Sequence, residues 1–104
     1  RDVVRALIAL MQNDAANGRV FNVGNPEEIS IGDLARLVIE KTGSRSEIRL
    51  VPYEEAYGPD FEDLERRVPD TTRLASVIDW SCLATLDEIL DDVIDDTRRR
   101  LGIA

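Results

Sequence analysis

Hydrophobic residues recur at helical spacing in four stretches of the chain, at residues 2–13, 30–43, 70–78 and 85–100. In each stretch, apolar side chains three or four positions apart share one face of a helix, with polar residues between them. In the first stretch, valine, leucine, isoleucine and methionine side chains recur at this spacing, and Arg5 and Gln12 lie outside the apolar face. The pattern predicts four helices.

Local signals indicate where these helices begin and end. Ser30 and Asp33, like Thr85 and Glu88, have the spacing of a capping box, in which a side-chain oxygen binds the first free backbone amides. Gly43 is expected to end the second helix. Asp70 is expected to cap a short third helix, whose Leu74, Val77 and Ile78 face inward.

Two short β-prone segments, Val20–Val23 and Ile48–Val51, follow the first and second helices. They predict an α/β fold: a small helix-rich domain with two short strands. Two strands alone make a poor sheet, so a partner surface is expected to complete them. The chain also opens with Arg1 instead of methionine. We therefore expect residues 1–104 to form one domain of a longer polypeptide.

Composition excludes several classes of function. The 104 residues carry a formal charge of −8, with 21 acidic and 13 basic side chains, which argues against nucleic-acid binding. Without histidine, the single cysteine cannot form a Cys–His nucleophilic pair, and an internal disulfide is excluded. No apolar run is long enough to span a membrane. A lone cysteine fits a reducing compartment, so a cytoplasmic location is expected.

Basic and aromatic residues gather in an irregular stretch, residues 57–70, between the second and third helices. Arg66 and Arg67 lie shortly before Pro69, and Tyr57 and Phe61 lie upstream of them. Guanidinium groups bind phosphates and carboxylates, so an anion pocket is one interpretation. Ion pairing with nearby acids (Glu62, Asp63, Glu65) is the alternative, and the residues alone favour neither.

Other notable side chains have structural explanations. The acids Asp91, Asp92, Asp95 and Asp96 lie opposite the apolar stripe of the last helix, where solvated charges are usual, so no metal site is predicted. Trp80 is expected to fill the core, and Cys82 is expected to be a buried, unreactive thiol. The Gly24 turn lacks the glycine spacing of a dinucleotide-binding loop.

At the level of whole motifs, the chain resembles a known family. The relevant segments are Asp2-Val3-Val4-Arg5-Ala6, Val20-Phe21-Asn22-Val23-Gly24-Asn25, Glu28-Ile29-Ser30-Ile31, Arg67-Val68-Pro69-Asp70, and Trp80 with Leu86. Their order and spacing resemble the C-terminal part of extended short-chain dehydrogenase/reductase proteins, the NAD-dependent nucleotide-sugar epimerases, dehydratases and decarboxylases. That family joins a Rossmann-type NAD(P) domain to a smaller substrate-binding domain, and the resemblance implies that this chain is the latter.

The resemblance also implies roles for individual residues. The loop looks most like that of UDP-glucuronate decarboxylases. Arg67 matches an arginine that meets the sugar acid and assists proton transfer, and Asp63 matches an acidic residue of the nucleotide-binding segment. Phe61 matches a tyrosine that contacts the nucleotide sugar, and without a hydroxyl it could contribute only stacking. These three residues are the predicted substrate-binding set.

By the same resemblance, NAD or NADP binds mainly to the domain outside this chain, and no cofactor is expected on the fragment itself. The sequence has no Tyr-x-x-x-Lys pair, so the fragment is not expected to be catalytically active alone. Its expected ligand is a nucleotide sugar, a UDP-sugar above all. The parent is expected to be a homodimer, and the fragment to self-associate. The alternative to this whole interpretation is a free-standing acidic protein-interaction module.

Overall fold

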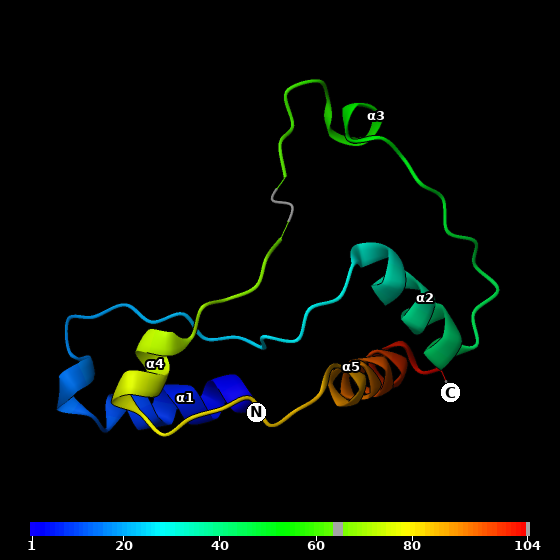
Figure 1. Cartoon of the computed structure of the whole chain (residues 1–104). Coiled ribbons are helices and arrows are strands. Elements are labelled where there is room, and N and C mark those ends of the chain that lie inside the picture. Colours follow the sequence, from blue (N-terminus) through cyan, green and yellow to red (C-terminus); the bar gives the residue numbers. More distant parts are fainter. Residues whose placement is uncertain (64–65, 104) are drawn as a thin grey trace. The chain divides into compact units, whose positions relative to one another are not determined.

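The computed structural model describes residues 1–63 and 66–103, and within them every regular element is a helix (Figure 1). The chain divides into two compact units. The first unit joins Arg1–Glu28 to Val68–Ala104, and the second consists of Ile29–Arg67. The second unit therefore interrupts the sequence of the first.

The first unit contains α1 (Asp2–Met11), the short 3₁₀ helix η1 (Asp14–Ala16), α4 (Thr72–Val77) and α5 (Leu86–Leu101). Its core forms where α1 and α4 lie side by side (Figure 1), with Ala6, Leu74 and Ile78 buried. Half-buried apolar side chains complete this cluster: Ala9, Leu10, Phe21, Val23, Val77 and Trp80. The prediction that Trp80 fills the core is confirmed.

The helix α5 begins as its sequence predicts. The hydroxyl of Thr85 accepts from the backbone N–H of Glu88 at 3.2 Å, and the Glu88 carboxylate accepts from the backbone N–H of Thr85 at 2.9 Å. This reciprocal capping box satisfies amides that have no partner within the helix. Acidic residues in the first turn and three arginines in the last both suit the helix dipole.

The second unit contains α2 (Ile31–Thr42) and α3 (Tyr53–Tyr57). Ser30 caps α2 by accepting from the backbone N–H of Asp33 at 3.1 Å, as expected. Gly43 ends the helix with a φ of 66°, a conformation that glycine adopts without a side-chain clash. The five-residue helix α3 was not predicted, because one turn and a half is too short to show a period.

The α/β fold expected from the sequence is wrong: the described residues contain no strand and no sheet. Val20–Val23 does alternate, with Phe21 and Val23 half-buried against the core and Asn22 exposed. This alternation arises from packing on helices instead of sheet pairing. Ile48–Val51 lies in the other unit with Leu50 89% exposed, so that segment buries no apolar face that would hold a strand.

The predicted cap of α4 is displaced by one residue. Thr71 occupies the N-cap position, and Asp70 precedes it. The Asp70 carboxylate nevertheless accepts from the backbone N–H of Thr72 at 2.9 Å and from its hydroxyl at 2.6 Å. Asp70 therefore satisfies the first turn from outside the helix.

No helix in the described part of the chain is long and apolar enough to cross a membrane.

Candidate functional site

The loop that carries the predicted site residues starts from α3. Pro52 precedes this helix, and Gly58 ends it with a φ of 95°. This left-handed backbone is open to glycine and strained for other residues, and it directs the chain out of the helix. The residues that follow bring Phe61 back toward the two tyrosines of α3.

Three aromatic rings form a cluster within the second unit. The Phe61 ring stacks on Tyr57, with centroids 4.3 Å apart and planes 23° apart, and its centroid is 5.4 Å from that of Tyr53. Tyr53 and Tyr57, one helical turn apart, lie at 6.3 Å. All three side chains stay 40% or more exposed. The cluster therefore offers ring surface to a ligand while holding its own geometry.

The acidic and basic residues of the predicted set pair with each other. The Arg67 guanidinium donates through Nη2 to Oδ1 of Asp63. The hydroxyl of Tyr53 donates to the other carboxylate oxygen at 3.3 Å. Tyr53 thus links the aromatic cluster to the Asp63–Arg67 pair, because its ring contacts Phe61 and its hydroxyl contacts Asp63.

The sequence left two interpretations of the arginines open: ion pairing with nearby acids, or binding of an anion. Arg67 does pair with Asp63, and this pairing leaves room for an anion as well. A guanidinium carries five N–H donors, and the Asp63 contact uses one of its terminal nitrogens. The Arg67 side chain remains 69% exposed. It can hold Asp63 and still meet an anion. Glu65, an alternative ion-pair partner, lies outside the described residues, and Arg66 is exposed.

The sequence analysis predicted Phe61, Asp63 and Arg67 as substrate-binding residues, and in the structure these three residues lie in one unit. The sequence analysis did not select Tyr53, which contacts both Phe61 and Asp63. A signal was present: Tyr53, Tyr57 and Phe61 recur every four residues, the spacing that places side chains on one side of a helix.

Two other motifs from the sequence meet in the first unit. Gly24 packs against the ring of Pro69, and a Cβ built on Gly24 would lie 2.8 Å from Cγ of that proline. The amide of Asn22 donates to the backbone carbonyl of Asp70 at 3.4 Å. The close approach of Pro69 explains why residue 24 is a glycine, since a side chain would collide with the proline ring. Because Pro69 occupies this side of the turn, the turn at Gly24 does not hold a pyrophosphate.

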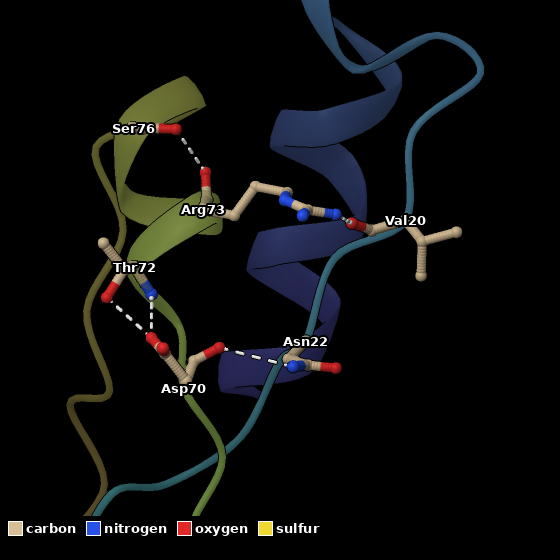
Figure 2. A pocket seen from close by; sticks show the side chains of 6 residues that line it. All are labelled: Val20, Asn22, Asp70, Thr72, Arg73 and Ser76. Carbon is tan, nitrogen blue, oxygen red and sulfur yellow. Dashed lines mark hydrogen bonds between the residues drawn. The ribbon is translucent and has the colours of Figure 1, made fainter.

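A polar pocket of about 420 Å³ opens beside this contact (Figure 2), lined by Val20, Asn22, Asp70, Thr72, Arg73 and Ser76. Its polar groups already bind one another: the Arg73 guanidinium donates to the carbonyl of Val20 at 3.1 Å. The hydroxyl and backbone N–H of Thr72 lower the pKa of Asp70 and keep this carboxyl ionised. The polar groups that line the pocket therefore serve to hold α4 and Asp70, which precedes it, against residues 20–22.

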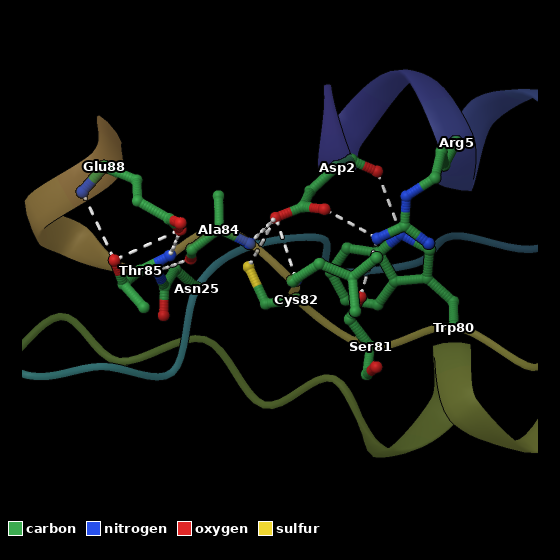
Figure 3. Close-up of polar contacts among 10 residues, drawn as sticks. Asp2, Arg5, Asn25, Trp80, Ser81, Cys82, Ala84, Thr85 and Glu88 are labelled. Atoms are coloured by element: carbon green, nitrogen blue, oxygen red, sulfur yellow. Dashed lines mark hydrogen bonds and ion pairs between the residues drawn. The ribbon is translucent and has the colours of Figure 1, made fainter. Parts of the chain in front are cut away.

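Asp2 is the centre of a second polar network in the first unit (Figure 3). Its Oδ1 accepts from Arg5 at 2.6 Å, and its Oδ2 accepts from the backbone N–H groups of Leu83 and Ala84 at 3.1 and 3.0 Å. The Arg5 contact, then the Ala84 and Cys82 contacts, lower the pKa of Asp2 well below its usual range. The indole of Trp80 donates to the Asp2 carbonyl at 2.9 Å.

Cys82 belongs to this same network. Its thiol donates to Asp2 Oδ2 at 3.2 Å, and burial followed by the Asp2 contact raises its pKa. A thiol held protonated is a poor nucleophile. Cys82 is half-buried, not fully buried as expected, and its raised pKa agrees with the expected lack of reactivity. In the part of the chain that the structure describes, no group of three His, Cys, Asp or Glu side chains could hold a metal ion.

Comparison with known proteins identifies related sequences. The chain is 29% identical to UDP-D-apiose/UDP-D-xylose synthase 2 of Arabidopsis thaliana over 90% of its own length and 26% of the relative's. It is 33% identical to UDP-N-acetyl-alpha-D-glucosaminuronate decarboxylase of Bacillus cytotoxicus, over 89% of the chain and 29% of the relative. It is 32% identical to UDP-glucuronic acid decarboxylase 1 of Xenopus tropicalis, over 96% of the chain and 22% of the relative.

The chain thus spans about a quarter of the length of the curated relatives it matches. No protein-family model matches it, and no solved structure matches it significantly. The relatives are nevertheless UDP-sugar enzymes, and the similarity runs through nearly all of the chain. The resemblance seen in the sequence motifs is confirmed to this extent: nearly all of the chain is similar to one part of nucleotide-sugar enzymes.

Proposed function

We propose that residues 1–104 form the substrate-binding domain of a longer NAD(P)-dependent enzyme that acts on UDP-sugars. The observation that carries the proposal is the aromatic and charged cluster of the second unit, which joins Phe61, Asp63 and Arg67. The names of the relatives support a UDP-sugar, and two of them name a uronic acid. We therefore take a UDP-uronic acid as the substrate class.

The cluster suits such a ligand chemically. Exposed rings provide a stacking surface for a base or a sugar ring. The Arg67 guanidinium matches the geometry of a carboxylate or a phosphate, and Asp63 holds this side chain in place. The role proposed for Arg67 is to bind the anionic group of the substrate and to assist proton transfer next to it.

The nicotinamide cofactor is assigned mainly to a domain outside this chain. The Gly24 turn is closed against Pro69, and the sequence lacks both the glycine-rich loop and the Tyr-x-x-x-Lys pair. Hydride transfer is therefore assigned to a Rossmann-type domain elsewhere in the longer polypeptide. The 104-residue chain alone is proposed to be inactive, in a cytoplasmic protein.

Calorimetric titration of UDP-glucuronic acid and of UDP into the longer protein tests the proposal. Arg67→Ala removes charge-assisted hydrogen bonds worth ~1.5–3 kcal/mol, so it should weaken UDP-glucuronic acid binding by at least about tenfold. If Arg67 meets the sugar carboxylate, UDP binding should stay unchanged, and if it meets a phosphate, both affinities should fall.

The matched control is Arg36→Ala. Arg36 lies in the same unit, is 70% exposed, and pairs with Asp33 at 2.5 Å on α2. Removing it deletes a comparable exposed ion pair away from the aromatic cluster, so affinity should not change. Equal affinities for wild type and Arg67→Ala would overturn the role given to Arg67.

A further inference from the structure

Asn17 and Gly18 form an exposed turn between η1 and the segment that packs against the core of the first unit. Both residues are exposed, and Gly18 has a φ of 72°, in the left-handed region. A Cβ built on Gly18 would meet nothing within 4 Å. The turn is therefore open to solvent on the side where a side chain of residue 18 would project.

Two polar groups of this turn have no partner in the described chain. The backbone N–H of Asn17 donates to the carbonyl of Asp14 at 3.1 Å, and that of Arg19 donates to the carbonyl of Ala16 at 3.2 Å. Between these bonds, neither the side-chain amide of Asn17 nor the backbone N–H of Gly18 makes a hydrogen bond to any residue that the structure describes. No contact there competes with a reaction between the two groups.

An asparagine followed by a glycine can modify itself. The backbone nitrogen of Gly18 attacks Cγ of Asn17, and the new C–N bond closes a cyclic imide. The side-chain nitrogen leaves as ammonia and carries the proton of the attacking N–H with it. Water then opens the imide at either carbonyl and gives aspartate or isoaspartate. Glycine favours the attack because it has no Cβ to shield its nitrogen.

The turn reaches the reactive geometry by flipping one peptide plane. Asn17 has a ψ of 130°, at which the Gly18 nitrogen points away from the Asn17 side chain. Rotation of the planar peptide between the two residues changes this ψ and the φ of Gly18 in opposite senses. Glycine adopts φ values of either sign, so Gly18 accepts the change. The two flanking hydrogen bonds stay formed, because neither uses a group of this peptide plane.

The three other asparagines of the chain lack this combination. Asn25 is followed by a proline, which has no N–H to attack the side chain. The amide of Asn13 donates to the carbonyl of Val77 at 2.9 Å. The amide of Asn22 donates to the carbonyl of Asp70 at 3.4 Å. These three residues are therefore internal controls for the exposed turn.

We propose that Asn17-Gly18 is a modification site, at which the folded protein deamidates spontaneously to aspartate and isoaspartate. Each conversion replaces a neutral amide with a carboxylate and adds one negative charge to a chain whose formal charge is −8. The isoaspartyl product also adds one carbon to the main chain, shortly before the segment that places Phe21 and Val23 against the core. The chemistry of this site is independent of the proposed function.

Incubation of the longer protein at neutral pH tests the proposal. Trypsin digestion and mass spectrometry detect the mass difference between an amide and an acid, and fragmentation of the peptides assigns it to one asparagine. Samples taken over time give a conversion rate for each asparagine of residues 1–104. A parallel incubation in urea gives the same rates in the unfolded chain. Gly18→Ala is the variant that tests the attack itself.

In the folded protein, Asn17 should convert at least about tenfold faster than Asn13, Asn22 and Asn25, and within about tenfold of its own rate in urea, because the turn opens locally. Gly18→Ala should slow Asn17 by about tenfold or more, in urea as well as in buffer, so this result does not depend on the fold of the variant. A folded Asn17 that converts no faster than Asn22, or more than about tenfold slower than in urea, would overturn the proposal. An unchanged rate in Gly18→Ala would do the same.

Discussion

Replacement of Leu74 by alanine tests whether the first unit is organised as described. Leu74 is the largest fully buried side chain among the described residues, and it packs with Ala6 and Ile78 where α1 meets α4. Truncation removes three carbons, which at ~0.8 kcal/mol each corresponds to about 2.4 kcal/mol of lost burial. A cavity term adds to this, and the usual total for such a change is ~2–5 kcal/mol.

We expect a loss of about 3 kcal/mol, in the lower half of that range, because α4 has only six residues and can settle toward the cavity. For a domain of this size, each kcal/mol corresponds to ~4–8 °C, so the midpoint of thermal unfolding should fall by roughly 12–24 °C. Helical circular dichroism followed against temperature and urea measures both quantities.

Leu83→Ala is the matched control. It makes the same chemical change in the same unit at a side chain that is 69% exposed, and its backbone N–H contact with Asp2 is kept. Its effect should stay within about 0.5 kcal/mol. A Leu74→Ala loss below about 1 kcal/mol, or equal losses for both variants, would refute the core described above.

Three further predictions concern single contacts. Gly24→Ala should lower the unfolding midpoint measured by circular dichroism, because its Cβ would lie 2.8 Å from the Pro69 ring, and an unchanged midpoint would contradict that close approach. The pKa of Asp2 is lowered from its ordinary value of 3.8, so its contribution to stability is present above that pH and is lost as the pH falls below it. Asp2→Asn should therefore flatten the acid limb of urea stability against pH, and an unchanged slope would show that another carboxyl governs it. Tyr53→Phe keeps the ring but removes the hydrogen bond to Asp63, an exposed bond worth ~0.5–1 kcal/mol. UDP-glucuronic acid should therefore bind the longer protein about two- to fivefold more weakly. If Tyr53→Ala loses no more affinity than Tyr53→Phe, the ring contributes nothing to binding.

Features fixed by neighbouring residues were predictable from the sequence. Ser30 and Thr85 cap their helices through contacts that span three residues, and Gly43 ends α2 by its own backbone freedom. Each of these signals involves residues close together in the sequence, so it predicts the helix end without knowledge of the tertiary structure. The same locality brought Asp63 and Arg67 together, since they are four residues apart.

Features set by distant partners were not predictable in this way. Residues 20–23 alternate like a strand, but the alternation reflects packing of Phe21 and Val23 on helices. In α1, the period alone could not separate Leu10, which packs inward, from Met11, which is 86% exposed, because both side chains are apolar. The role of Asp70 also depended on a distant residue, since its carbonyl accepts from Asn22.

The contacts of Asp2 have a consequence for the timing of folding during synthesis. The bond between Trp80 and the Asp2 carbonyl joins residues 78 positions apart, and those to Leu83 and Ala84 span more. At ~5–20 residues per second, a ribosome needs roughly 4–16 s to add that length of chain. Throughout this interval α1 exists without α4 and Trp80, so the contacts that fix Asp2 can form only after most of the chain has been made.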